Sequence, residues 1–324
     1  MERNNIFNEE VYKEVNKESK DILQDYILEL KSRGRAKKTI EQYVFDIKMA
    51  YCYFQENNSN KSILDLKKRD FRNFFLMLQE TGKSSARINR VQSSLRNLLE
   101  FVVDDEDDYE DYYKNPMKKI KSVEKNPVKE IVFLTDEQVD YLIDYLMERK
   151  KYQKALYVSL SYDSAARRNE IHQVKKNNFL ESNMTNSVIG KRGKQFPLMY
   201  MNRTREIAEK YFEERGEDSI ESLWVSYYNG EARPLTYETL YQWAISFRSI
   251  LEDKYDEDLP INSHSFRHTS LENYENGTHH NLKDMGKENL SINELRVLAN
   301  HENIDITQSY LKNKDQEILS DLFS

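Results

Sequence analysis

The sequence predicts a mainly α-helical protein made of two domains. Its 324 residues exceed the usual length of one domain and suffice for two hydrophobic cores. Only 8 residues are glycine and 5 are proline, so long helices meet few interruptions. Apolar residues recur at helical spacing along most of the chain, whereas one Gly-bearing stretch has the pattern of a short β-hairpin.

A helical bundle is expected over residues 18–103. Residues 18–30 carry an apolar stripe at helical spacing, and Thr39 can cap a second helix with a similar stripe. A third helix is expected over residues 68–81, and a fourth follows Gly82. The four apolar stripes predict one shared core for this first domain.

Polar or charged segments flank the bundle. Residues 1–17 are polar and mixed in charge, so they do not have the pattern of a signal peptide. Residues 104–130 are predicted to be a linker, because they lack apolar periodicity and contain Asn115-Pro116 and Asn126-Pro127. Within this linker, residues 104–111 (DDEDDYED) are almost wholly acidic, and no function follows from that run.

The second domain is expected over residues 131–324, mainly helical with a small antiparallel β-sheet. The capping-box pattern that starts at Thr135 predicts its first helix. Residues 186–198 predict two short strands around a Gly-bearing turn, and residues 223–228 add a short extended piece. From Tyr237 onward the pattern is that of helices separated by polar loops.

The composition indicates a soluble protein of a reducing, cytoplasmic compartment. No stretch approaches the length of a membrane span, and the single cysteine, Cys52, excludes an internal disulfide or a cysteine metal cluster. The net charge of −7 weighs against a nucleic-acid partner. However, basic residues concentrate over residues 31–38 and 118–125, which is typical of basic faces on an acidic protein.

Four segments of the second domain carry the residues for chemistry on a phosphodiester. They are Ala166–Ile171 (ARRNEI), Gly190–Lys194 (GKRGK), His264–Thr269 (HSFRHT), and Asn300-His301 with Tyr310 nine residues later. In order and internal spacing these segments resemble the motifs of the tyrosine recombinase, or phage integrase, family. The resemblance covers essentially the whole chain, because residues 20–103 also resemble the helical, SAM-like core-binding domain of that family.

The resemblance implies a catalytic set and an activity. The implied catalytic residues are Arg167, Lys191, His264, Arg267, His301 and Tyr310. A chain of this kind binds double-stranded DNA at specific sites, associates with itself as a dimer or tetramer on DNA, and cuts and rejoins strands through a 3′-phosphotyrosyl intermediate. Neither a metal nor a nucleotide cofactor is expected. A phage or mobile element in a bacterial host is the implied source, with the protein cytoplasmic and associated with the nucleoid.

General chemistry supports these residue types. Guanidinium groups such as those of Arg167 and Arg267 form paired, charge-assisted hydrogen bonds to phosphate oxygens. An imidazole such as that of His264 transfers protons near neutral pH. Each residue also has a purely structural interpretation, since Glu170 lies one turn from Arg167 and Tyr310 is one of 22 tyrosines. The joint order and spacing favour the catalytic interpretation.

Basic residues outside these motifs are candidates for DNA contact. Such side chains would mainly neutralise phosphates, and a solvated basic face is the alternative for any one of them. The candidates are Arg33, Arg35, Lys37, Lys38, Lys83, Arg87, Arg90, Arg96, Lys118 and Lys119.

Three departures from the family pattern bear on activity. Ala165-Ala166 stands before Arg167 where a glycine and a leucine or methionine are usual, and Asn300 replaces a glycine. Residues 278–291 are inserted and can displace His301 and Tyr310 from the arginines. The second hypothesis is therefore a catalytically silent, DNA-binding repressor of this fold, and the third is a helical interaction protein with chance motif matches.

Overall fold

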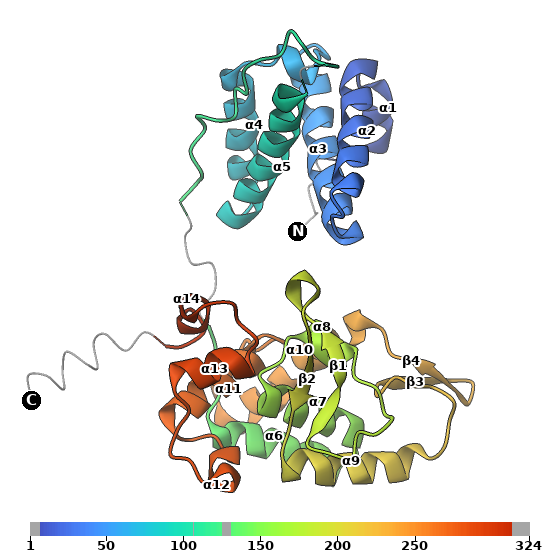
Figure 1. Ribbon diagram of the computed structural model, residues 1–324, viewed down its shortest axis with the longest axis vertical. Helices are drawn as coiled ribbons and strands as arrows, with labels where there is room; N and C mark the ends of the chain where they lie inside the picture. The colour runs from blue at the N-terminus through green and yellow to red at the C-terminus, as the bar shows by residue number, and fades with distance from the viewer. Residues whose placement is uncertain (1–6, 106, 125–130, 313–324) are drawn as a thin grey trace, which may run out of the picture. The chain divides into compact units, whose positions relative to one another are not determined.

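The computed structural model describes residues 7–105, 107–124 and 131–312, and it divides the chain into two compact units. The first unit covers residues Met1–Lys129 and the second covers Glu130–Ser324. Helices dominate both units, and the strands form two small antiparallel hairpins (Figure 1). The mainly α fold class with a small antiparallel sheet is confirmed.

The first unit is a helical bundle with an aromatic core. Asn16 and Ser84 cap two of its helices through side-chain oxygens. Phe54 packs against Phe71 and Phe74 with ring centroids 5.4 Å apart in both pairs. Its elements are α1 (Glu9–Glu14), α2 (Lys17–Ser32), α3 (Lys37–Asn57), the 3₁₀ turn η1 (Ile63–Asp65), α4 (Lys68–Glu80) and α5 (Ser85–Asp104).

The directions of the helices gather the loops of this unit at two ends. Figure 1 shows the α2–α3 loop and the α4–α5 loop at one end, and η1 at the other. The stretch expected to be a linker lies partly on the bundle, because Met117 and Ile120 are buried in its core. These two apolar side chains lack helical periodicity, so the sequence pattern alone did not place them in the core.

The second unit contains the remaining elements in chain order. They are α6 (Asp136–Glu148), α7 (Tyr152–Ser164), α8 (Arg168–His172), β1 (Met184–Ile189), η2 (Lys191–Gly193), β2 (Gln195–Met199), α9 (Asn202–Arg215), β3 (Val225–Tyr228), β4 (Glu231–Pro234), α10 (Tyr237–Tyr255), α11 (Ser265–Asn276), α12 (Asn281–Met285), α13 (Ile292–Leu298) and α14 (Ile304–Gln308).

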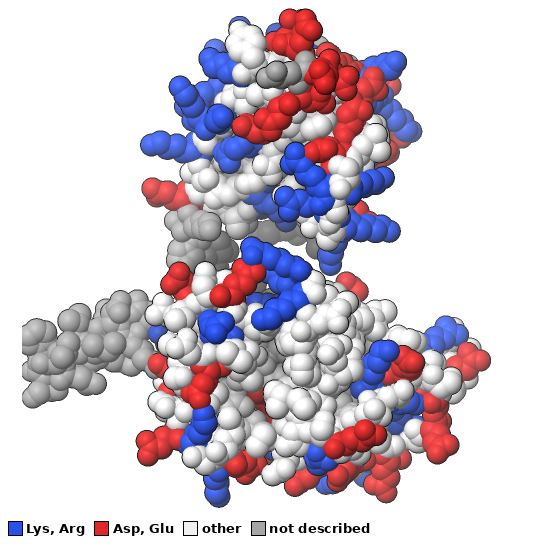
Figure 2. Space-filling model, in the orientation of Figure 1, with Lys and Arg blue, Asp and Glu red and all other residues white. Residues whose placement is uncertain are grey.

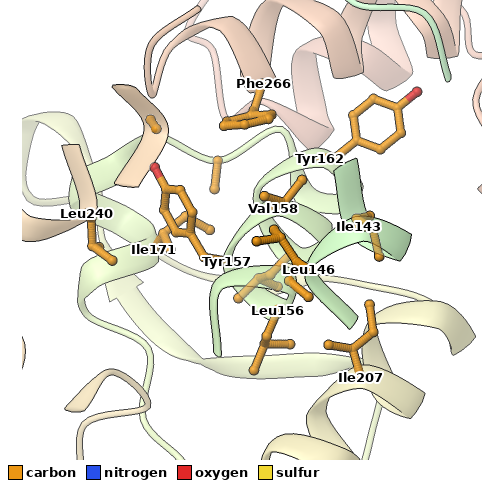
Figure 3. Packing of buried hydrophobic residues seen from close by; sticks show 14 of the residues in the cluster. Ile143, Leu146, Leu156, Tyr157, Val158, Tyr162, Ile171, Ile207, Leu240 and Phe266 are labelled. Carbon is orange, nitrogen blue, oxygen red and sulfur yellow. The ribbon is translucent and has the colours of Figure 1, made fainter. Parts of the chain in front are cut away.

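Helix α7 is the centre of this unit. Its last ten residues are all buried, which is the pattern of a helix covered on every side. Figure 3 shows Tyr157 and Val158 of α7 among Leu146 of α6 and Phe266 of α11. Each fully buried side chain of this size contributes about 1.5–3 kcal/mol. Because α7 is fixed in this way, its C-terminal end is a rigid base for the residues that follow it.

The two hairpins differ in how their turns form. In the expected hairpin, β1 pairs with β2 and Val188 lies opposite Phe196. The second hairpin joins β3 to β4 through Asn229-Gly230, whose φ angles are 49° and 80°. Two positive φ angles at an Asn-Gly pair characterise a tight type I′ turn. Only an extended piece was expected at residues 223–228, although Asn-Gly is a strong hairpin signal.

Helices long enough and apolar enough to cross a membrane do not occur within the described residues.

Candidate active site

Arg267 is the centre of the predicted site and is fully buried on α11. Its Nη1 donates to the carbonyl oxygen of Ala165 at 2.5 Å, and its Nη2 donates to that of Ala299 at 2.7 Å. Nη2 also lies 2.6 Å from Nε2 of His301. One guanidinium therefore joins the end of α7 to the end of α13, which brings three of the four sequence motifs together.

The two acceptor carbonyls depend on backbone with positive φ. Ala165 has φ 49°, and Asn300, which follows Ala299, has φ 50°. At both positions the sequence has another residue where glycine is usual, and glycine is the residue that adopts positive φ most readily. Asparagine tolerates this region, whereas alanine pays about 1–2 kcal/mol for it. Because Ala165 is fully buried, the surrounding packing maintains this backbone.

Arg167 and Glu170 form the second part of the site. Glu170 is buried, and it accepts from Arg167 N at 2.7 Å and from Arg167 Nη1 at 3.0 Å. Its other contact is Arg267 Nη1, 3.9 Å from Oε2. One carboxylate thus lies between two guanidinium groups, and an excess positive charge remains. The structural pairing of Arg167 with Glu170 and an anion-binding role are therefore compatible.

His301 and Tyr310 lie against this arginine pair. His301 Nδ1 is 3.0 Å from Thr307 Oγ1, and burial, followed by the charges of Arg267 and Arg167, lowers the pKa of His301 to about 3. Arginine only donates, so His301 Nε2 accepts from Arg267, and Nδ1 carries the proton toward Thr307. The Tyr310 ring centroid is 5.0 Å from Arg267 Cζ and 5.0 Å from the His301 ring centroid.

The inserted residues 278–291 do not displace these groups. They contain the short helix α12, and Leu282 and Leu290 from this segment are buried with Ala165 and Ala299 in a small apolar cluster. Tyr310 packs against the same cluster. The insertion therefore adds to the support beneath the site.

His264 and Lys191 lie at the exposed side of the site. His264 precedes α11, and its pKa is lowered by partial desolvation, then by the neighbouring imidazole of His268 and by the positive charges of the nearby arginines. Lys191 is exposed in η2, directly after Gly190. A β-carbon at Gly190 would lie 2.7 Å from the Phe196 ring and 3.4 Å from Glu170 Oε1. This close approach explains the glycine and places the hairpin beside Glu170.

The turn after Gly190 is also fixed from the other side. Arg192 Nη1 lies 2.5 Å from a carboxylate oxygen of Glu302, the residue after His301. Figure 2 shows blue side chains next to red ones over this turn, at the upper edge of the second unit. The predicted lysine-bearing hairpin and the predicted histidine segment are therefore neighbours.

Sequence reasoning missed the acceptors of Arg267. The carbonyls of Ala165 and Ala299 carry no side-chain signal, and only the unusual residues at positions 165 and 300 indicate them. Glu170 had been considered only as a partner of Arg167. Its capping-box spacing to Arg167 is a local signal, but its approach to Arg267 depends on the tertiary fold.

The candidate DNA-contact residues divide into exposed and internally bonded groups. Arg33, Arg35, Lys37 and Lys38 are exposed at the α2–α3 loop, and Lys83 lies in the α4–α5 loop at the same end of the first unit (Figure 1). Some of these basic side chains also have acidic partners within the unit, since Arg33 pairs with Glu29 and Lys37 lies 4.0 Å from the carboxylate of Glu41.

Arginines of α5 are engaged inside the bundle. Arg87 Nη2 and Arg90 Nε lie 3.0 and 3.1 Å from the carboxylate of Asp46, which is fully buried. Burial raises the pKa of Asp46, and Arg90 opposes that shift. Arg96 donates to the carbonyl oxygen of Ile120 at 3.1 Å. All three were predicted as candidates for DNA contact, and that prediction did not anticipate these internal partners.

Lys118 and Lys119 do not join the other candidates. They are exposed beside Glu100 near the end of α5, and Lys118 lies 3.3 Å from that carboxylate. The same hollow is lined by Lys67 and Lys68 at the start of α4. This is the end of the first unit opposite the α4–α5 loop.

Among the described residues, one group has the spacing of a metal site. Ligand atoms of Asp136, His279 and His280 lie within 4.8 Å of one another. However, His279 Nδ1 accepts from Asn281 N at 3.2 Å, and His279 Nε2 donates to the carbonyl of Tyr162 at 3.3 Å. Both ring nitrogens of His279 are thus engaged, so we assign no metal to this group.

Family models match segments of both units. Residues 132–317 match the model of the phage integrase family, and residues 23–106 match that of the phage integrase N-terminal SAM-like domain. The chain is 26% identical over 274 residues to the SPbeta prophage-derived recombinase-like protein YomM of Bacillus subtilis, covering 80% of this chain and 79% of that protein. It is 31% identical over 149 residues to the putative tyrosine recombinase TTE1313 of Caldanaerobacter subterraneus, covering 45% and 48%.

Solved structures share the fold at low sequence identity. A lambda integrase dimer bound to a core site aligns with a TM-score of 0.69 and 16% identity, covering 94% of this chain and 80% of that one. The Tn1549 transposon integrase in complex with transposon right end DNA aligns with a TM-score of 0.64 and 17% identity, covering 90% and 95%.

Proposed function

The chain belongs to the phage integrase, or tyrosine recombinase, family, and we propose that it cuts and rejoins DNA at specific sites with Tyr310 as the nucleophile. The observation that carries the proposal is the packing of Tyr310 and His301 against the buried guanidinium of Arg267. A tyrosine of this kind gains reactivity only where an anionic transition state is stabilised next to it.

The arginine pair would bind the scissile phosphate. The excess positive charge around Glu170 suits a phosphodiester anion, and each preorganised donor is commonly worth ~3 kcal/mol or more in such a transition state. Arg167 is the more accessible of the two, with 23% of its side chain exposed. We therefore assign direct phosphate contact first to Arg167, while Arg267 orients the site and contributes charge.

The strand-cleavage step exchanges one phosphoester for another. The Tyr310 oxygen forms a bond to phosphorus while the bond from phosphorus to the 5′-oxygen breaks, leaving a 3′-phosphotyrosyl linkage. The phenolic proton passes to His264, whose lowered pKa keeps its imidazole neutral and able to accept. Lys191 on the exposed turn donates a proton to the departing 5′-oxygen. Attack by a second 5′-hydroxyl reverses these transfers and rejoins the strands.

His301 has a role in this scheme that differs from phosphate donation. Its Nε2 accepts from Arg267 and its Nδ1 donates to Thr307, so neither nitrogen offers a proton to a phosphate in this arrangement. His301 would orient the Arg267 guanidinium, and a donor role would require rotation or protonation of the ring.

DNA contact outside the site would come from the exposed end of the first unit. Arg33, Arg35, Lys37, Lys38 and Lys83 gather there, and their contribution would depend strongly on salt. Lambda integrase has been seen as a dimer on a core site and as a tetramer on a Holliday junction. We infer that this chain likewise associates with itself on DNA.

One observation favours the alternative of a silent, DNA-binding repressor. Both terminal nitrogens of Arg267 are taken up by protein acceptors, and Ala165 replaces the usual glycine beside them. A site committed to internal bonds can retain DNA binding without chemistry. This alternative predicts tight, specific binding and no covalent intermediate.

The deciding experiment uses a nicked suicide DNA that carries a site selected from a random library by the protein itself. Wild type should form a covalent protein–DNA adduct, and Tyr310→Phe should form none while its affinity for the same DNA stays within about twofold. Tyr113→Phe, which changes a highly exposed tyrosine, is the matched control and should behave as wild type. Equal binding by all three proteins with no adduct from any of them would establish the repressor.

A further inference from the structure

His268 follows Arg267 in the sequence but contacts the nucleophile. Its Nδ1 lies 3.0 Å from the carbonyl oxygen of Tyr310, and its ring stacks on the Tyr310 ring with centroids 4.4 Å apart and planes 26° apart. One contact fixes the main chain of Tyr310, and the other fixes its side chain. No step of the proposed strand cleavage uses this histidine.

The chemistry of the bond defines the state of His268. A carbonyl oxygen only accepts, so Nδ1 carries the proton. Burial lowers the pKa of His268, and the positive charge of Arg267 lowers it further, whereas the Tyr310 carbonyl opposes the shift. The ring is therefore neutral at pH 7 and acts as a donor through Nδ1 without adding charge next to Arg267.

The segment around Tyr310 has a second attachment to α11. Lys312 N donates to Glu272 Oε2 at 2.8 Å, and Glu272 lies on α11 one turn after His268. The Phe133 ring forms a T-shaped contact with the His268 ring, with centroids 5.9 Å apart, and the amino group of Lys312 lies 5.4 Å from the Phe133 ring centroid. Packing against Phe133 thus helps to hold the His268 ring where it contacts Tyr310.

Helix α14 alone does not fix the nucleophile. It covers only Ile304–Gln308, a length that is unstable in isolation, and Tyr310 comes after it. Three rings or charged groups surround the Tyr310 ring, namely Arg267, His268 and His301. Of these three residues, His268 also forms a hydrogen bond with the main chain of Tyr310.

We propose that His268 is a positioning residue that holds Tyr310 against the arginine pair through its Nδ1–H bond and its ring stack. This inference rests on the proposed role of Tyr310 as nucleophile. A displacement of the attacking oxygen by about 1 Å costs on the order of a hundredfold in rate. His268 would therefore change the rate of adduct formation without changing DNA affinity.

Three substitutions separate the two contacts. His268→Asn keeps an N–H donor near the position of Nδ1 and loses the ring, whereas His268→Phe keeps a ring and loses the donor. His268→Ala loses both. We expect adduct formation on the nicked DNA to fall about 100-fold for His268→Ala and about 10-fold for each of the other two, with DNA affinity within about twofold of wild type. His172→Asn, which alters a histidine bonded to the Leu235 carbonyl, should retain the wild-type rate.

A second measurement does not depend on chemistry. Hydrogen exchange over residues 304–312 of the free protein should be faster in His268→Ala than in wild type, and slower again in His268→Asn than in His268→Ala. If wild type forms no adduct but exchange behaves as described, the proposed function fails and the positioning role stands. A wild-type adduct rate in His268→Ala overturns the inference. Unchanged exchange in His268→Ala, or a parallel loss of DNA affinity and rate in all three variants, overturns it too.

Discussion

Two buried clusters of charged side chains lie close together in the second unit, and they differ in charge balance. In the arginine site, the guanidinium groups of Arg167 and Arg267 share the single carboxylate of Glu170, and Nε of Arg267 is buried without a hydrogen bond. In the other cluster, which we call the histidine cluster, His280 lies between two carboxylates. Its Nδ1 is 3.3 Å from Asp136 Oδ1, and its Nε2 is 3.2 Å from Asp163 Oδ1.

The remaining member of the histidine cluster, His279, is neutral. Its ring is sandwiched between Tyr162, at 4.0 Å, and Tyr274, at 3.6 Å, and burial lowers its pKa to about 3. Hydrogen bonds and the charges of Asp136 and Asp163 raise the pKa of His280 to about 9 against the opposing effect of its burial. The cluster therefore contains one stable cation, His280, which pairs with the carboxylates of Asp136 and Asp163.

The difference in charge balance indicates different roles for two clusters that contain similar types of residue. The histidine cluster is closed, since its cation and anions face one another, and it fastens the inserted residues to the ends of α6 and α7. The arginine site is open, because its positive charge exceeds its negative charge. Asp163 and Ala165 are only two residues apart, so the closed cluster also steadies the backbone that supplies an acceptor to Arg267.

The largest expected effect comes from removing the cation of the closed cluster. His280→Leu leaves the buried Asp163 and the half-buried Asp136 without their partner, and breaking a buried pair in this way costs about 3–5 kcal/mol. Chemical denaturation of the full chain should show this loss in the transition of the second unit. Lys283→Ala, an exposed change in the same insertion, should leave the transition within about 0.5 kcal/mol of wild type. An equally small effect of His280→Leu would show that the histidine cluster does not stabilise the second unit.

The open site should show the reverse pattern. Arg167→Gln removes a partly exposed guanidinium, and we expect adduct formation to fall about 10²–10³-fold, the usual effect of losing one donor to a transition-state oxyanion. The free energy of unfolding should change by only about 1 kcal/mol, because the Arg167 backbone bond to Glu170 persists. A quench-flow adduct assay and denaturation of the same preparations test both halves. If Arg167→Gln lost stability and kept the wild-type rate of adduct formation, Arg167 would be a structural residue and would not bind the phosphate.

The raised pKa of His280 predicts a loss of stability at alkaline pH. Below an unfolded-state value of about 6.5 both states bind the proton, and between about 6.5 and 9 only the folded state binds it. Stability therefore falls progressively as the pH rises from about 6.5 to about 9, by on the order of 3 kcal/mol, and levels off above that. His279 and His301 have lowered pKa values, so they affect the free energy of unfolding only below about pH 6.5. There the unfolded chain binds protons that the folded chain does not, and stability falls as the pH is lowered. Denaturation between pH 6 and 10 should show an alkaline slope in wild type that is absent in His280→Asn.

The contrast between the clusters also separates what the sequence could predict from what it could not. Arg167, Arg267, His301 and Tyr310 were predicted from motif order and spacing, and the fold brings them together. The histidine cluster was not predicted, because Asp136, Asp163 and His280 are far apart in sequence and belong to no recognisable pattern.

The pairing of α5 arginines with a buried carboxylate was the other feature that could not be predicted from the sequence. A helical wheel places Arg87 and Arg90 away from the apolar stripe, yet both extend to Asp46, a carboxylate buried on a neighbouring helix. Periodicity indicates which face of a helix is apolar. It does not indicate that a polar residue such as Asp46 on another helix is buried and needs partners.

The smallest expected effect tests the openness of the arginine site directly. Inorganic phosphate should bind the excess positive charge at Arg167 and Arg267 and stabilise the folded chain. At a concentration ten times its Kd, a ligand that binds only the folded state contributes about 1.4 kcal/mol.

Phosphate also stabilises proteins in general through exclusion from their surfaces, so the informative quantity is the difference between wild type and Arg167→Gln in the same buffer. We expect wild type to gain about 1 kcal/mol more than the variant between chloride and phosphate at matched ionic strength. His280→Asn should gain as much as wild type, because the closed cluster has no positive charge to spare for an added anion. Equal gains in wild type and Arg167→Gln would mean that Glu170 already satisfies both arginines, and the distinction between an open and a closed cluster would then fail.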